Sequence, residues 1–210
     1  MKIIGIIGLG RWGNNIFNSL IKNKNIKKII VTSIPLLKYQ GDIEIEHVPY
    51  IDNEDNFLKK INAVIVATSP LHHEDILYKC KNYKIPALFE KPITASTNSL
   101  KTMIKDTYFN NYIDVDYIYL YSSLWKTYLN NIKFRNSDQI YIQFWSGNNG
   151  PIRKDVNIFW DWLPHDFSML FSITNYWDFE IDKISLIKDK KMIYYRINLL
   201  KKNIKVEINV

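Results

Sequence analysis

The feature that most constrains the fold is a glycine-rich turn between an apolar run and an amphipathic stretch. Residues 2–7 are an apolar run, which is typical of a buried parallel strand. The turn over residues 8–13 fits G-x-G-x-x-G, and residues 12–23 carry apolar side chains near helical spacing. The pattern alone is weak, but a strand, this turn and a helix in succession predict a dinucleotide-binding Rossmann unit.

Each glycine of the turn has a physical purpose in such a unit. Gly8 permits the tight turn, Gly10 lets the backbone approach a pyrophosphate, and Gly13 lets helix and strand pack closely. The N-terminus of the following helix offers free N–H groups and a positive dipole end to an anion. The residues of the turn that we expect to bind the cofactor are Gly8, Gly10, Arg11, Trp12 and Gly13.

The residues after the second expected strand bear on the choice of cofactor. NAD-binding units usually carry an acid about 20 residues after the glycine turn, to hold the ribose 2′-OH. This chain has Thr32 and Ser33 there, with Lys38 nearby and no carboxylate to repel a 2′-phosphate. We therefore predict that Thr32 and Ser33 contact the cofactor and that NADP is favoured, with NAD possible. The alternative is an adenosine end held loosely or by main chain.

Strand-like and helical stretches alternate along the first part of the chain. The expected strands are 2–7, 28–31, 63–67, 87–89 and 116–121. The expected helices are 12–23, a helix that opens at the cluster 52–55 and runs to 61, 74–82 and 97–110. This alternation is typical of βαβ units and a parallel sheet. Beyond it we expect helices at 124–132 and 165–174 and strands at 139–145, 179–188, 192–200 and 203–210.

The change of rhythm defines the expected fold class. We predict an α/β protein with an N-terminal Rossmann dinucleotide-binding domain over residues 1–122. A smaller α+β domain with a largely antiparallel, open sheet follows over residues 123–210. We place the boundary near Ser122 and Ser123.

Composition limits the other classes of function. The net charge of +7 comes from lysines scattered along the chain, so we expect no nucleic-acid partner, which needs a clustered patch. A single cysteine, Cys80, excludes an internal disulfide, and no His/Cys/carboxylate spacing predicts a metal site. The first residues are too short for a signal peptide or a membrane span, so we expect a cytoplasmic protein without a membrane partner.

Three further stretches accompany the glycine turn. Residues 67–73 are Ala-Thr-Ser-Pro-Leu-His-His, residues 90–92 are Glu-Lys-Pro, and residues 160–166 are Trp-Asp-Trp-Leu-Pro-His-Asp. In this order the four motifs resemble the glucose–fructose oxidoreductase, inositol dehydrogenase and rhizopine catabolism (Gfo/Idh/MocA) family. The resemblance covers about residues 1–175. Glu-Lys-Pro alone is only moderately specific, whereas the ordered set is far more so.

The resemblance implies an activity and the residues for it. Members of this kind oxidise a secondary hydroxyl of a sugar, sugar derivative or nucleotide sugar by hydride transfer to the nicotinamide. The catalytic residues then fall on Lys91, Asp161 and His165. A carbohydrate substrate and a homo-oligomer that pairs through the C-terminal sheet are also implied. The cofactor contacts that it adds are Thr68, Pro70, His73, Glu90 and Lys91.

The chemistry asks for these residue types. An imidazole titrates near neutrality, so His165 can take the hydroxyl proton. Asp161 can orient that imidazole or contact the sugar, and Lys91 can stabilise negative charge on the oxygen. Asp161 and His165 are four residues apart, which is one helical turn. However, Pro164 predicts that the helix begins only there, so this spacing is not purely helical.

Each residue also has a plain structural alternative. Lys91 can lie in a turn, His165 can be a hydrogen-bonded structural residue, and Asp161 can cap a helix. Arg153 and Lys154 can hold a substrate phosphate or carboxylate, or lie in a solvated loop. The aromatic side chains around the third motif can stack on a sugar, although core packing is the commoner use.

Two departures from the family pattern keep a second function open. Leu163 stands where the family usually has a small residue, and only residues 167–210 follow the third motif, fewer than the family's second domain contains. The chain is then either a short member or a fragment. The alternative to an enzyme is a non-catalytic dinucleotide-binding regulator or partner subunit of the same fold.

Overall fold

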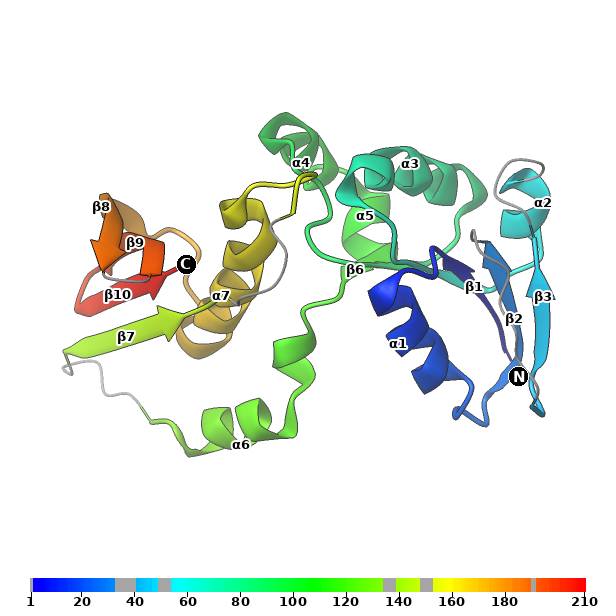
Figure 1. Cartoon of the computed structure of the whole chain (residues 1–210), viewed down its shortest axis with the longest axis horizontal. Helices are drawn as coiled ribbons and strands as arrows, with labels where there is room; N and C mark the ends of the chain where they lie inside the picture. Colours follow the sequence, from blue (N-terminus) through cyan, green and yellow to red (C-terminus); the bar gives the residue numbers. More distant parts are fainter. Residues whose placement is uncertain (1, 33–40, 49–53, 134–138, 148–152, 190–191) are drawn as a thin grey trace. The chain divides into compact units, whose positions relative to one another are not determined.

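The chain divides into two compact units, Met1–Asp116 and Tyr117–Val210 (Figure 1). The computed structural model describes residues 2–32, 41–48, 54–133, 139–147, 153–189 and 192–210. The expected domain boundary, near Ser122 and Ser123, lies slightly inside the second unit, directly before a helix.

The first unit is a six-stranded sheet with helices between the strands. Its strands are β1 (Lys2–Ile7), β2 (Ile26–Thr32), β3 (Glu44–His47), β4 (Ala63–Val66), β5 (Ala87–Phe89) and β6 (Ile113–Val115). Its helices are α1 (Arg11–Leu20), α2 (Glu54–Lys59), the 3-10 helix η1 (Pro70–His72), α3 (His73–Tyr83), α4 (Thr97–Met103) and α5 (Thr107–Tyr112).

All neighbouring strands of this sheet are parallel, in the order β3-β2-β1-β4-β5-β6. The chain moves outward from β1 to β3 and then returns to the other side of β1 at β4. Ile7 at the end of β1 pairs with Thr32 on one side and Val66 on the other. The glycine turn therefore follows β1 at the point where the strand order reverses, which is where doubly wound sheets bind ligands. The predicted Rossmann fold is confirmed.

Helices cover both faces of this sheet, and side-chain alternation explains how. Ile6 and Val31 point toward the Phe17 side chain of α1. Their neighbours Ile7 and Ile30 point the opposite way, into a core that includes residues of α2, α3, α4 and α5. Figure 1 shows α1 and α3 on opposite sides of the strands. A strand buried on both faces is continuously apolar, as the sequence of β1 is.

The sequence expectations up to residue 121 differ from the structure in three places. The four-residue strand β3 was not predicted, because an edge strand pairs on one side only and its apolar pattern is weak. The helix expected over residues 97–110 is two helices, since the Asp106 carboxylate accepts the Tyr108 N–H at 2.9 Å and starts α5 anew. The strand expected at residues 116–121 is wrong: the sheet ends with β6, and η2 (Ile118–Tyr121) is a 3-10 helix.

The second unit places one long helix on a four-stranded sheet. Its elements after η2 are α6 (Ser123–Asn131), β7 (Ile140–Trp145), α7 (Ile158–Thr174), β8 (Glu180–Asp189), β9 (Met192–Lys201) and β10 (Ile204–Asn209). The sheet order is β7-β10-β9-β8, with β8, β9 and β10 antiparallel and β10 parallel to β7. Leu170 of α7 packs with Phe144, Leu199 and Val206 in the core. This confirms the predicted smaller domain with a largely antiparallel sheet.

A buried carboxyl group links α7 to the end of β7. The Ser146 hydroxyl donates to the Asp166 carboxylate at 2.6 Å, and Asp166 is 5% exposed. Burial raises the pKa of Asp166 to about 6, because desolvation penalises the charged form more than the Ser146 hydrogen bond favours it. Burial of this carboxyl therefore destabilises the folded state less when Asp166 is neutral than when it is charged.

The glycine turn yields a first prediction on stability. A Cβ on Gly13 would lie 2.0 Å from the Gly8 carbonyl oxygen, so Gly13→Ala must push α1 away from the turn. We expect urea unfolding to show a loss of about 1–3 kcal/mol, the usual cost of overpacking. Gly10→Ala is the control, because nothing lies within 4 Å of a Cβ there and its φ of −68° suits alanine. Equal losses in both variants would contradict the packing role of Gly13.

Asp166 yields a prediction on pH. Its folded pKa of about 6 lies above its ordinary value of 3.8, so the folded state holds this proton more tightly than the unfolded state. The carboxyl therefore makes the free energy of unfolding fall as pH rises from about 4 to about 6, and the loss persists at higher pH. Asp166→Asn keeps an acceptor for Ser146 and removes the titration. We expect urea unfolding to show the variant more stable than wild type at about pH 8, with the difference shrinking toward about pH 4. A pH-independent difference would contradict this assignment.

Candidate functional site

The turn after β1 has the backbone that its glycines allow. Gly8 has a φ of +92°, in the left-handed region, and a Cβ there would lie 2.9 Å from the Ala67 carbonyl oxygen. The Gly8 N–H donates to the Thr32 carbonyl at 3.0 Å, which ties the turn to the end of β2. The turn is thus fixed against the strands on both sides of β1.

The N-terminus of α1 faces open space at Gly10. Gly10 is the N-cap residue and is exposed, with no atom within 4 Å of where a Cβ would be. The first turn of α1 carries no acidic residue, so its dipole favours an anion there. The Asn14 amide donates to the Leu9 and Gly10 carbonyls at 2.8 Å and 3.0 Å and stiffens the turn. These features fit the pyrophosphate of a dinucleotide.

The other residues that we expect to contact the cofactor near this turn differ in their exposure, and some lie outside the described residues. Arg11 and Trp12 are exposed at the start of α1, and Trp12 is 47% exposed. Thr32 ends β2 and is buried. Ser33 and Lys38 lie outside the described residues.

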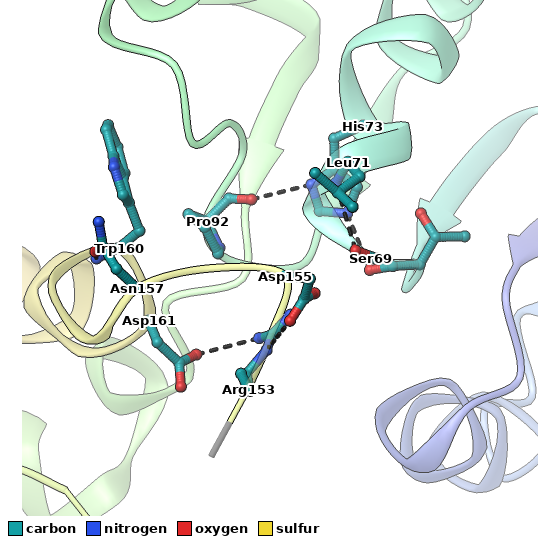
Figure 2. Close-up of polar contacts among 10 residues, drawn as sticks. Ser69, Leu71, His73, Pro92, Arg153, Asp155, Asn157, Trp160 and Asp161 are labelled. Carbon is teal, nitrogen blue, oxygen red and sulfur yellow. Dashed lines mark hydrogen bonds and ion pairs between the residues drawn. The ribbon is translucent and has the colours of Figure 1, made fainter.

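The loop after β4 turns directly into a short helix. The Ser69 hydroxyl accepts the Leu71 N–H at 3.4 Å and caps η1, whose first residue is the buried Pro70 (Figure 2). The Thr68 hydroxyl oxygen is buried and has no hydrogen-bond partner among the described residues. Thr68 also lies next to Gly8. A ligand bound at the glycine turn could therefore supply the hydrogen-bond partner that the Thr68 hydroxyl needs.

His73 joins this loop to the Glu-Lys-Pro loop. Its ring nitrogens lie 3.0 Å from the Pro92 carbonyl oxygen and 3.2 Å from the Thr68 carbonyl oxygen (Figure 2). The side chain is fully buried, with its ring edge-on to Phe89 at 5.3 Å. The resemblance implies that His73 lies beside the nicotinamide ribose; the structure uses its ring to hold two loops together.

Glu90 and Lys91 follow β5 at the carboxyl end of the sheet. The Glu90 N–H donates to the Val66 carbonyl at 2.9 Å, and Glu90 is buried. Lys91 is partly exposed and is joined to Pro92 by a cis peptide bond. Beyond it, the Thr94 hydroxyl donates to Glu74 at 2.7 Å and accepts the Ser96 N–H at 2.9 Å. Lys91 thus projects from a loop that is anchored on both sides.

In the second unit, Asp161 and His165 lie on one continuous helix. The Asn157 side chain caps α7 by accepting the Trp160 N–H at 3.1 Å, so the helix begins at Ile158. Pro164 lies inside it, and the expectation that α7 begins near Pro164 is wrong. A proline in the helix interior removes one N–H donor, and the long apolar side of α7 offsets this by packing on the sheet. Asp161 and His165 are therefore separated by one regular turn.

The Asp161 carboxylate is bound to Arg153. Nη1 of Arg153 donates to Asp161 at 3.1 Å, while Nε and Nη2 hold Asp155 at 3.0 Å and 2.6 Å (Figure 2). Asp155 and Asp161 raise the pKa of Arg153, the hydrogen bonds to Asp155 first. Lys154 is exposed. The sequence indicated Arg153 as a possible anion ligand, but nothing in it indicated Asp155 as its partner.

His165 is enclosed by aromatic rings. It is 6% exposed, and the rings of Tyr119 and Tyr117 lie edge-on at 4.8 Å and 6.4 Å. These tyrosines were assigned to a strand by their apolar pattern, so the sequence did not indicate them as neighbours of the site.

The remaining side chains of the third motif belong mostly to the core. Phe159, Trp162 and Leu163 pack against the buried cluster under the sheet, and the Phe159 ring lies 4.8 Å from that of Tyr195. Leu163 therefore fills the helix–sheet interface, where its size is needed. Trp145 is the exception, since it is 57% exposed at the end of β7.

Two general features of the described residues bear on the class of site. No group of three or more His, Cys, Asp or Glu side chains in the described ranges could hold a metal ion. No helix in that part of the chain is long and apolar enough to cross a membrane.

Comparisons with known proteins find relatives of the first unit. The chain is 32% identical over 100 residues to inositol 2-dehydrogenase 1 of Paenarthrobacter aurescens, covering 46% of this chain and 30% of that protein. Inositol 2-dehydrogenase of Arthrobacter sp. is 33% identical over the same length and with the same coverage. The match thus spans about a third of these curated relatives.

Solved structures share the fold over the whole chain. A myo-inositol dehydrogenase of Corynebacterium glutamicum has a TM-score of 0.76 at 14% identity, covering 100% of this chain and 68% of that one. The scyllo-inositol dehydrogenase of Lactobacillus casei, solved with NAD(H) and scyllo-inositol, has a TM-score of 0.70 at 16% identity, covering 100% and 69%. At such identities the likeness concerns the fold.

The family model described as "Oxidoreductase family, NAD-binding Rossmann fold" matches residues 2–107, which is half of the chain. The chain therefore belongs to the Gfo/Idh/MocA oxidoreductase family.

Proposed function

We propose that the chain transfers a hydride between a nicotinamide dinucleotide and a secondary hydroxyl of a sugar or polyol. The observation that carries the proposal is the pair Asp161 and His165 on successive turns of α7, with Asp161 bound to Arg153 and His165 among aromatic rings. The glycine turn of the first unit supports it from the cofactor side. The relatives named inositol dehydrogenases support a polyol as the substrate class.

The bound nicotinamide would supply the hydride acceptor, and the chain supplies the proton and charge chemistry. His165 takes the hydroxyl proton on its imidazole as the general base. Asp161 accepts a hydrogen bond from the substrate or from the charged imidazole, and stabilises the latter. Lys91 would stabilise negative charge on the reacting oxygen with its ammonium, as the resemblance implies.

We further propose that the substrate is neutral rather than phosphorylated. Three N–H groups of Arg153 are already bonded to Asp155 and Asp161, so its charge is balanced within the protein. Because two carboxylates surround this one guanidinium, Arg153 offers no uncompensated positive charge to a phosphate or carboxylate of a substrate. A neutral polyol suits such a site better than a nucleotide sugar.

We also propose a preference for NADP over NAD and a homo-oligomer that pairs through the C-terminal sheet. NADP is favoured over NAD because β2 ends in Thr32 and not in a carboxylate.

A homo-oligomer through the C-terminal sheet would use the side of the sheet away from α7. Tyr141 and Trp145 are exposed there at 61% and 57%. Paired aromatic surfaces of this kind are common at interfaces.

Two substitutions test the catalytic assignment. His165→Ala removes the base and Lys91→Ala removes the stabilising charge, so each should lower kcat/KM on a neutral polyol by at least about 100-fold. NADPH binding, followed by fluorescence titration, should persist in both. The exposed residues His72 and Lys101 provide matched controls, His72→Ala and Lys101→Ala, that should keep wild-type activity.

The same assays separate an enzyme from a regulator. Tight NADPH binding by the wild-type chain without turnover of any polyol or sugar would support the non-catalytic alternative. Near-normal turnover in either His165→Ala or Lys91→Ala would show that the roles are assigned to the wrong residues.

A further inference from the structure

Asp161 belongs to a chain of three charged side chains. The Arg153 guanidinium donates to it through Nη1 at 3.1 Å, and it grips Asp155 side-on through Nε and Nη2 at 3.0 Å and 2.6 Å. Figure 2 shows the guanidinium between the two carboxylates, on the stretch that leads into α7. One residue thus connects a carboxylate of the loop with a carboxylate of the helix.

Asp155 and Asp161 contact the Arg153 guanidinium in different ways, Asp155 through two hydrogen bonds and Asp161 through one. A side-on, two-bond grip fixes the plane of a guanidinium, so Asp155 determines where the remaining Nη1 edge points. Only that edge reaches Asp161. A lysine ammonium has no such plane and cannot make a two-bond grip and a directed third bond in the same way.

Partial burial makes these contacts stronger than ordinary surface pairs. The side-chain exposures are 35% for Arg153, 26% for Asp155 and 17% for Asp161. Exposed ion pairs contribute little because water competes for both partners, and that competition is reduced here. Asn157 caps the same first turn of α7, so both the backbone and the carboxylate of this turn are held in place.

We propose that Arg153, held by Asp155, is a positioning residue that fixes the Asp161 carboxylate for catalysis. This inference rests on the proposed function, in which Asp161 accepts a hydrogen bond from the substrate or from His165. Arg153 acts through Oδ1 of Asp161, and Asp155 contributes by holding Arg153. Without the guanidinium, the two carboxylates would repel each other and Asp161 would rotate away from its present position.

Four variants test this order of action. Arg153→Met keeps the aliphatic stem and removes the guanidinium, and it should lower kcat about 10- to 100-fold, as misplacement of a reacting group does. Arg153→Lys should recover part of that loss, and Asp155→Asn should lower kcat less than Arg153→Met. The double variant Arg153→Met/Asp155→Asn should lose less than the product of the two single losses, because Asp155 contributes by holding Arg153.

The control is Lys188→Met, which removes the same charge from an exposed position of β8 and should keep wild-type kcat. Affinity for NADPH should stay unchanged in every variant, and thermal melting shows which variants are folded. Wild-type kcat in folded Arg153→Met would overturn the inference. So would a double variant whose loss is the product of the two single losses.

A readout without turnover separates this inference from the proposed function. The Arg153 Nε–H signal in ¹H–¹⁵N spectra should be protected in the wild-type chain, lost in Asp155→Asn and shifted in Asp161→Asn. If the wild type oxidises no polyol, the proposed function fails, and these spectra alone decide whether Arg153 holds Asp161. An Arg153 Nε–H signal that stays unchanged in both Asp155→Asn and Asp161→Asn would overturn the positioning role.

Discussion

The close approach of the Gly13 backbone to the Gly8 carbonyl is the contact on which the N-terminal unit depends. A single added carbon at Gly13 would lie 2.0 Å from that oxygen, so α1 can begin immediately after β1 only because a side chain is absent. This contact brings the N-terminus of α1 to the point, after β1, where the strand order of the sheet reverses. The open space at Gly10 is a consequence, and it is what makes the turn suitable for a pyrophosphate.

In the second unit the comparable constraint is the start of α7. Asn157 begins the helix early enough for Asp161 and His165 to lie on successive turns, and the packing of α7 on the sheet carries the helix through Pro164. Arg153 then connects the loop before the helix to its first turn. Asp161 and His165 therefore lie on one helix, while Lys91 and the cofactor groups lie on loops that strands and His73 hold in place.

The sequence was informative where a residue type has one physical use. Glycine at positions 8, 10 and 13 predicted the turn, and the apolar runs predicted most strands of both sheets. It was misleading where a pattern has two uses. The alternating aromatic residues at 117–121 suggested a strand, yet two of these tyrosine rings pack on His165 instead. Pro164 suggested a helix start, because the sequence does not show that packing can offset a missing N–H donor.

Contacts between distant side chains were beyond the sequence altogether. Nothing in the spacing of Arg153, Asp155 and Asp161 predicts that one guanidinium holds both carboxylates. His73 fits a family motif, yet its ring is occupied by two main-chain carbonyls. Such assignments need the fold, because they depend on which backbone atoms tertiary structure brings within hydrogen-bond distance.

We expect the glycine turn to hold a dinucleotide. Calorimetric titration of wild type and Gly10→Ala with NADPH and NADH tests it most directly, since an alanine Cβ at this position occupies space that a pyrophosphate needs and disturbs nothing else. The account predicts that wild type binds NADPH more tightly than NADH, and that Gly10→Ala loses at least about 10-fold in affinity for both, about 1.4 kcal/mol. Unchanged binding by Gly10→Ala, or no binding of either dinucleotide to wild type, would contradict it.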